Sequence, residues 1–275
     1  LALFLAGGTA MANDNDPPLT DDAPLGSPDV PVRVSPSKIE EFNRCELRWL
    51  LRACGATDSD LGRAHIGSLI HGLAERAVRE QWDRDQLFAA FELDFAALDV
   101  GEGWSARREY ERTRTMVTKL GNWLATQQRR VVGVEVEFDV TIGDARLTGR
   151  VDRLDAGPDG GLVVVDYKTG VSKVPEADLP NHAQLGAYQA AVEAGGFEHV
   201  APGERRSAGA GLVQLGTSAR GPSEQVQPPL ADSADPGWAA ELVRDTASGM
   251  RRPVFRAEPG QWCGYCPAKM SCPAQ

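Results

Sequence analysis

The chain has 275 residues, of which 42% are hydrophobic and 25% charged, as in an ordinary globular protein with a sizeable core. Its formal net charge of −10 argues against a simple nucleic-acid-binding module, because phosphate contacts need Lys and Arg. Five aspartates within residues 14–29 supply half of that charge, however, and basic patches such as Arg107–Arg108 and Arg129–Arg130 follow. The acidity therefore does not exclude an enzyme that acts on DNA.

The first 34 residues predict a tether rather than a domain. Residues 1–12 are apolar but lack the basic start of a signal peptide, and residues 13–34 are rich in Asp, Pro and Gly. We therefore expect a disordered linker over 1–34 and one domain over 35–275. No apolar run is long enough to cross a bilayer, so we expect a cytoplasmic protein without a membrane partner. Because the chain begins with Leu1, we also expect it to be the trailing part of a longer polypeptide.

The N-terminal half of the domain is predicted to be helical. Ser35-Pro36-Ser37 indicates a helix start, with Ser37 and Glu40 at capping-box spacing, and Gly55 ends that helix. Apolar periodicity predicts further helices at residues 64–82, 87–98 and 104–130. His71 lies beside the apolar stripe of the second helix, where a core histidine and a ligand are equally good interpretations. The Arg-rich outer face of the last helix is more typical of a solvated surface than of a DNA contact.

The C-terminal half predicts a mixed α/β sheet with helices packed on it. Strands are expected at residues 131–140, 145–155, 162–167 and 211–215, and helices at 178–194 and 236–250, with a Gly-rich connector at 195–209. Glu135 falls on the first strand, where a solvent-facing glutamate and a residue near a functional site are weighed equally. No internal repeat indicates a solenoid.

The most informative stretch is Gly149–Gly170, GRVDRLDAGPDGGLVVVDYKTG, which predicts two strands joined by a turn at 156–161. Asp166 and Lys168 are two residues apart, so they project from the same face of the second strand. The apolar run before them is typical of a strand buried on both faces, where charge is costly without a partner. With Asp152 they indicate a divalent-metal site for Mg²⁺ or Mn²⁺, in which carboxylates hold the ion and the lysine orients an attacking water.

A second group of chemically active residues lies at the C-terminus. Cys263-x2-Cys266-x5-Cys272 has the spacing of metal ligands, and five cysteines in all fit a secreted disulfide framework poorly. A fourth thiolate is needed, for which Cys45 and Cys54 are the candidates. Four thiolates suit either zinc or an iron–sulfur cluster, and the spacing alone does not choose between them.

These motifs together resemble a known family. The segments SPSKIEEFNRCELRWLL, GSLIHGLAE, GRVDRLD, VVVDYKTG, QLGAYQ and CGYCPAKMSCPA are similar, in the same order, to RecB-type nucleases of the PD-(D/E)xK superfamily. The resemblance is to their iron–sulfur branch, which includes the AddB nuclease domain, the CRISPR-associated four-cysteine exonucleases and the AdnA and AdnB helicase–nucleases. It covers about residues 35–273.

The resemblance implies a restriction-endonuclease-like mixed sheet with an iron–sulfur clasp that joins the two ends of the domain. It selects Cys45 over Cys54 as the partner of the three C-terminal cysteines in a 4Fe-4S cluster. The implied site residues are the metal ligands His71, Asp152, Asp166 and the Tyr167 carbonyl, the catalytic residues Asp152, Asp166 and Lys168, the cluster ligands Cys45, Cys263, Cys266 and Cys272, and the DNA-binding residues Gln184 and Tyr188. The family's second carboxylate is often Glu, and Asp166 in its place keeps the metal-binding chemistry.

We therefore expect a metal-dependent DNA exonuclease domain within a bacterial helicase–nuclease that resects double-strand breaks. No Gly-x4-Gly-Lys-Ser/Thr motif occurs, so the helicase motor is expected upstream in the parent chain or in a partner subunit. The alternative is a catalytically silent DNA-binding or scaffold domain that retains the fold and the cluster. The intact charged residues argue against that alternative, because a retired site has no need to keep buried charges.

Overall fold

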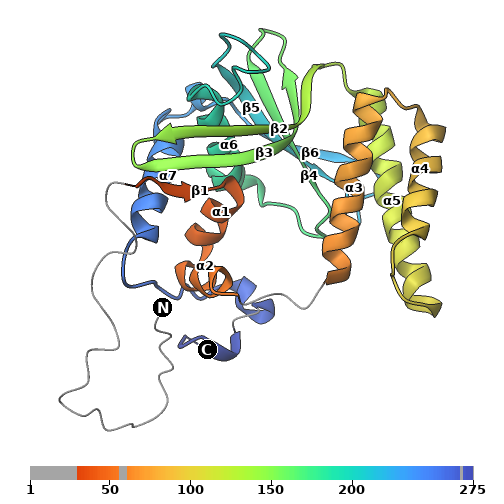
Figure 1. Ribbon diagram of the computed structural model, residues 1–275, viewed down its shortest axis with the longest axis horizontal. Helices are drawn as coiled ribbons and strands as arrows, with labels where there is room; N and C mark the ends of the chain where they lie inside the picture. Colours follow the sequence, from red (N-terminus) through yellow and green to blue (C-terminus); the bar gives the residue numbers. More distant parts are fainter. Residues whose placement is uncertain (1–29, 56–60, 267–268, 275) are drawn as a thin grey trace.

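The computed structural model describes residues 30–55, 61–266 and 269–274, and its centre is a mixed six-stranded sheet (Figure 1). The strands are β1 (Val32–Val34), β2 (Arg130–Ile142), β3 (Ala145–Ala156), β4 (Leu162–Lys168), β5 (Ser207–Gln214) and β6 (Ser223–Gln227). Their order is β1-β3-β4-β5-β6, and β2 pairs with β3 along its length. The β1–β3 and β4–β5 pairs are parallel, whereas the other pairs are antiparallel. The mixed sheet expected from the sequence is thus confirmed.

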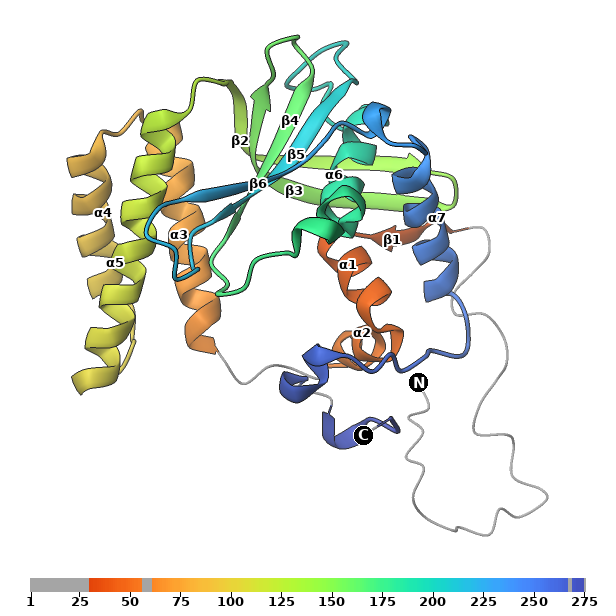
Figure 2. The same ribbon diagram turned by 180° about the vertical axis from the view of Figure 1, so that it is seen from behind.

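Helices cover both faces of this sheet (Figures 1 and 2). They are α1 (Pro36–Arg44), α2 (Glu46–Ala53), α3 (Leu61–Arg79), α4 (Arg84–Ala96), α5 (Gly103–Thr126), α6 (Ala183–Glu193) and α7 (Trp238–Met250), with short 3-10 helices η1 (Glu176–Asn181), η2 (Leu230–Asp232), η3 (Gln261–Tyr265) and η4 (Lys269–Ser271). The helices α3, α4 and α5 form one layer, and α1, α6 and α7 form the other. The sheet therefore has a hydrophobic core on each side.

Strand β4 shows how the two cores are divided. Its side chains alternate, so Val163, Val165 and Tyr167 pack toward α3 and α5, while Leu162 and Val164 pack toward α1, α6 and α7. All residues of β4 before Lys168 are buried. The strand buried on both faces that the sequence predicts is therefore present, and its charged end lies between the two helical layers.

The helix expected from residue 35 to residue 55 is divided at Cys45. Ser35, rather than Ser37, occupies the N-cap position and makes no side-chain cap hydrogen bond. Cys45 has an extended backbone, with φ −167°, and the amide of Leu47 donates to the carbonyl oxygen of Arg256 at 2.9 Å. Contacts with the C-terminal segment thus outweigh local helix propensity at this point.

The expected helix at 178–194 is likewise divided, into η1 and α6. Pro180 has no amide hydrogen to donate, which limits η1 to a short 3-10 turn. The side chain of His182 then caps α6 by accepting a hydrogen bond from the amide of Leu185 at 3.4 Å.

Two short strands were not predicted from the sequence. β1 begins at Val32, inside the expected linker, whose residues 1–29 lie outside the described residues. β6 reads SEQVQ, and its inward-facing residues Gln225 and Gln227 are polar, so it lacks the apolar alternation of a typical strand. Their amides are satisfied instead by hydrogen bonds, for example between Gln227 and Gln189 at 2.8 Å. The other expected elements are present with shifted ends, and β5 begins within the connector expected at 195–209.

Among the described residues, no helix combines the length and the apolar character that crossing a membrane requires.

The contact between α6 and α7 yields a stability prediction. A Cβ added at Gly186 would lie 2.3 Å from the ring of Trp238, so Gly186→Ala should destabilise the fold by about 1–3 kcal/mol through overpacking. Gly72 is a matched helical glycine with open space around its Cβ position, and Gly72→Ala should raise stability by about 0.5–1 kcal/mol. Urea unfolding of the two variants measures both effects, and equal shifts would contradict the packing argument.

Candidate active site

The pair β3–β4 opens at Asp152, the carboxylate that the sequence singles out. β3 pairs with β4 from Ala156 back to Arg153 and no further. The amide of Tyr167 lies beyond this ladder, and it donates to Oδ2 of Asp152 at 2.6 Å. The carboxylate of Asp152 therefore takes the place of a strand partner, which fixes its position where the two strands separate.

Two further side chains meet at Asp152. Nδ1 of His71, from α3, lies 3.0 Å from Oδ1 of Asp152. Glu135 stands between the pairs that β2 makes with β3 on either side of Asp152. One ligand atom from each of His71, Glu135 and Asp152 lies within 4.8 Å of the others, and the described part of the chain holds no other such group of three. A mixed imidazole and carboxylate set of this kind suits Mn²⁺ and is less favourable for Mg²⁺.

Glu135 is the site residue that the sequence left undecided. Its backbone has φ 50°, a left-handed conformation that is uncommon for a residue other than glycine and is found preferentially at functional sites. Its Oε2 forms an ion pair with Nε of Arg150 at 2.7 Å. The sequence signal was a carboxylate on the strand before Asp152, but only the register of β2 on β3 shows that the two residues meet.

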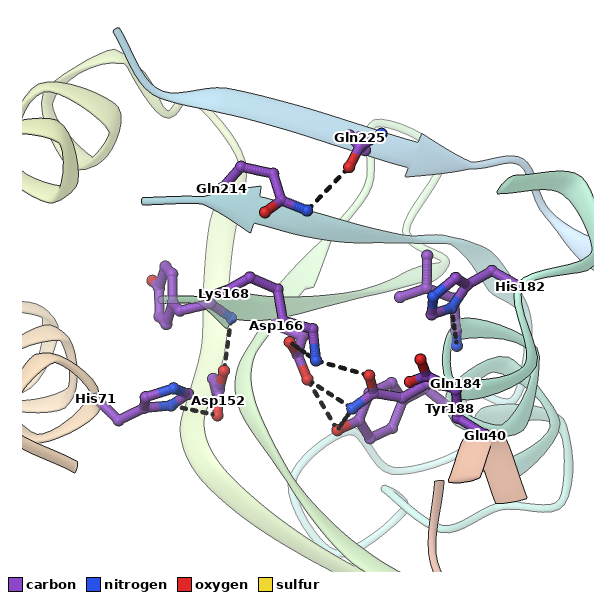
Figure 3. A network of polar contacts seen from close by, with 12 residues as sticks. Glu40, His71, Asp152, Asp166, Lys168, His182, Gln184, Tyr188, Gln214 and Gln225 are labelled. Carbon is purple, nitrogen blue, oxygen red and sulfur yellow. Dashed lines mark hydrogen bonds and ion pairs between the residues drawn. The ribbon is translucent and has the colours of Figure 1, made fainter. Parts of the chain in front are cut away.

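The second half of the site is a network on the α6 side of β4 (Figure 3). Nζ of Lys168 lies 2.9 Å from Oδ2 of Asp166 and donates to Oε1 of Gln184 at 2.7 Å. Nε2 of Gln184 and the hydroxyl of Tyr188 both donate to Oδ1 of Asp166, at 3.0 Å and 3.1 Å. Asp166 and Lys168 therefore share one face, as their spacing predicts, and α6 supplies the side chains that hold them.

Burial and pairing set the protonation of these groups. Burial raises the pKa of Asp166, and the charge of Lys168 opposes that rise. Burial alone would lower the pKa of Lys168, but the charge of Asp166 raises it above its usual value. Burial would also lower the pKa of His71, whereas its hydrogen bond to Asp152 raises it. The protein's own cations thus compensate the carboxylates in this arrangement.

The donor set fits a divalent cation in two respects. His71, Glu135 and Asp152 already form a compact group of ligand atoms. Oδ2 of Asp166 is buried, has no hydrogen bond of good geometry and lies 2.9 Å from the ammonium of Lys168, so a bound cation would share this oxygen with the lysine. Asp166 stands on the next strand, outside the compact group. Metal binding by Asp166 and by the Tyr167 carbonyl stays a prediction.

The four cysteines expected to act together line one cavity. Cys45 reaches it from the junction of α1 and α2, and Cys263, Cys266 and Cys272 reach it from the C-terminal segment. Cys54 is exposed and does not line the cavity. The amide of Gly260 donates to Sγ of Cys263 at 3.3 Å, and the amide of Glu258 donates to Sγ of Cys45 at 3.5 Å. Both ends of the domain therefore meet at a site where two of the four sulfurs accept backbone hydrogen bonds.

The fold and this arrangement agree with the comparison with protein families. The PD-(D/E)XK nuclease superfamily matches residues 33–273, which is nearly the whole chain, and the chain therefore belongs to that superfamily. Members of the superfamily are usually metal-dependent nucleases. The membership expected from the sequence motifs is confirmed, whereas the RecB-type assignment and the iron–sulfur cluster stay predictions.

Among solved structures, the chain is similar to the crystal structure of SSO0001, with 17% sequence identity and a TM-score of 0.39. The alignment covers 88% of this chain and 86% of that chain. The search of curated proteins found no match.

Two glutamates on β2 provide a direct test of the metal site. Glu135→Gln should weaken Mn²⁺ binding by about tenfold or more, because it removes a charged ligand from the compact group. Glu137 is two residues further along the same strand and exposed, so Glu137→Gln should leave the affinity unchanged. Isothermal titration of the two variants with Mn²⁺ measures the difference. Equal affinities would remove Glu135 from the ligand set.

Proposed function

We propose that this chain is a divalent-metal-dependent DNA exonuclease that hydrolyses phosphodiester bonds. The observation that carries the proposal is the pair Asp166–Lys168 at the end of the buried strand β4, next to the group of His71, Glu135 and Asp152. Membership of the PD-(D/E)XK nuclease superfamily supports a DNA substrate and a metal cofactor.

Each side chain has a definite role in this reaction. His71, Glu135 and Asp152 hold the cation, with Asp166 as a further ligand from β4. The cation, Mg²⁺ or Mn²⁺, supplies positive charge that polarises the phosphodiester. Lys168 keeps its ammonium charged and in place through Asp166 and Gln184, so it can orient the attacking water and stabilise the charge that develops on the phosphate.

The contacts of Gln184 and Tyr188 with Asp166 limit the movement of that carboxylate. Both side chains are buried, and Tyr188 has its pKa raised well above the usual value by burial, so it remains a neutral donor. We propose that they also steer the DNA backbone past Lys168, as the family resemblance implies. In that role their donors would pass from Asp166 to phosphate oxygens when the substrate binds.

The cysteine cavity supports a 4Fe-4S cluster bound by Cys45, Cys263, Cys266 and Cys272. Four thiolates around one cavity suit either zinc or an iron–sulfur cluster, and the resemblance of the sequence motifs to the iron–sulfur branch favours the cluster. The backbone hydrogen bonds to two of the sulfurs are of the kind that tune such clusters.

We also propose that this domain works with a helicase motor, in the same parent chain or in a partner subunit, during resection of DNA double-strand breaks in the cytoplasm. The chain contains no Gly-x4-Gly-Lys-Ser/Thr motif, so an ATP-driven motor would come from outside these 275 residues. The order of the six sequence motifs, which matches the iron–sulfur branch of the RecB-type nucleases, supports this setting.

Degradation of labelled DNA tests the exonuclease. With Mn²⁺, the chain should degrade linear single-stranded DNA and leave a circular single strand intact, because an exonuclease needs an end. Asp166→Ala should abolish the activity, and Lys168→Met should lower the rate by about 10²- to 10³-fold. The matched control is Asp159→Ala, an exposed aspartate in the turn between β3 and β4. Cleavage of the circle, or full activity in Asp166→Ala, would refute the assignment.

Substitution of Cys45 and of Cys54, with metal analysis, tests for the iron–sulfur cluster and for its fourth ligand. Purified protein should be brown, with iron and acid-labile sulfide, and Cys45→Ser should lose that colour and most of its soluble yield. The yield should fall because the cluster links Cys45 to cysteines more than 200 residues later in the sequence. In the chain-entropy model, a covalent bridge across so long a loop stabilises the folded state by about 4–5 kcal/mol. Cys54→Ser should keep both colour and yield, because Cys54 lies outside the cavity. A colourless protein with stoichiometric zinc would overturn the cluster.

A further inference from the structure

One face of α5 carries a stripe of residues that ends at the catalytic strand. Trp104, Arg108 and Arg112 follow one another at intervals of four residues, so they lie one above the other on the helix surface. With a rise of 1.5 Å per residue, the stripe is about 12 Å long. We refer to these three residues as the α5 stripe.

The inner end of the α5 stripe is attached to the site. Nη2 of Arg112 donates to the carbonyl oxygen of Thr169 at 3.0 Å, and Thr169 directly follows Lys168. Nη1 of Arg112 also pairs with Glu109 at 2.9 Å. A guanidinium has five N–H donors, so Arg112 keeps donors free for a ligand after making both contacts. The stripe therefore meets β4 one residue beyond the proposed catalytic lysine.

The outer end of the α5 stripe has no hydrogen-bond or ion-pair partner among the described residues. The side chain of Trp104 is 77% exposed, which is unusual for the largest aromatic residue. Arg108 is exposed, and it makes no hydrogen bond or ion pair with any residue in the part of the chain that the structure describes. An open indole face and an unpaired guanidinium one helical turn apart match the two components of a nucleotide, its base and its phosphate.

We propose that the α5 stripe binds single-stranded DNA and leads it to the active site. Trp104 stacks on a base, Arg108 contacts a phosphate, and Arg112 receives the next phosphate beside Thr169. A duplex would not fit this chemistry, because its base faces are covered by neighbouring base pairs. The inference rests on the proposed nuclease function for the identity of the ligand, but it predicts DNA binding that can be measured without catalysis.

Binding without catalysis separates the two proposals. The full chain is titrated, in EDTA and at several salt concentrations, into a fluorescent single-stranded DNA oligonucleotide, an RNA of the same sequence and the DNA duplex. Trp104→Ala should weaken binding of the DNA single strand at least about fivefold, while Trp104→Phe retains most of it, because stacking needs an aromatic face. Arg108→Ala should reduce the slope of log affinity against log salt by about 0.7, the value for one single-strand phosphate contact.

Arg107 is the matched control for Arg108. It is exposed and unpaired among the described residues, it lies on the same helix, and it points about 100° away. Arg107→Ala should therefore leave both the affinity and the salt slope unchanged. Equal effects at Arg107 and Arg108 would show a diffuse charge effect and overturn the proposal, as would no detectable binding or tighter binding of the duplex or the RNA.

Two outcomes keep this proposal distinct from the nuclease proposal. If Trp104→Ala and Arg108→Ala bind single-stranded DNA like the unaltered chain, and that chain degrades DNA, then DNA binding by the α5 stripe is refuted and the nuclease proposal stands. The expected binding pattern in a chain that degrades nothing would refute the nuclease and retain the stripe. Light scattering tests whether a second copy of the chain, rather than DNA, contacts Trp104. A Trp104→Ala variant that changes oligomeric state but not DNA affinity would identify a protein interface and overturn the proposal.

Discussion

The site depends on one interaction, the hydrogen bond from the amide of Tyr167 to the carboxylate of Asp152. The β3–β4 ladder stops at Arg153, and this bond holds the two strands in register at the point where they part. The side chains at the end of β4 alternate between the two helical layers. His71 can then reach Asp152 from α3, while Lys168 meets Gln184 from α6.

The arrangement places charged groups in a buried environment, which is energetically unfavourable, and pairing with partners reduces that cost. Asp166 is buried between strands, yet Lys168, Gln184 and Tyr188 all contact its oxygens. Because a buried carboxylate without partners would take up a proton, these contacts keep the oxygens suitable for a cation. The left-handed backbone of Glu135 adds local strain that the β2–β3 pairing on both sides sustains.

The cysteine cavity joins the junction of α1 and α2 to the C-terminal segment. Cys45 interrupts what would otherwise be one helix, and the interruption turns its sulfur toward the C-terminal segment. Hydrogen bonds of Glu46 and Leu47, at the start of α2, with the backbone of Arg256 already join the two ends of the described domain. A group bound by the cysteines would strengthen that closure next to α1, which packs against α6.

The sequence by itself determined the two-stranded motif around Asp152, Asp166 and Lys168, the shared face of the last two residues, most helices and the superfamily. Those features follow from spacing and local apolar pattern, which short-range geometry converts directly into structure. Only the tertiary structure decided that Glu135 joins His71 and Asp152 and that β1 and β6 exist. These depend on strand register and on contacts between distant segments, whose energies exceed local propensity and leave no local pattern.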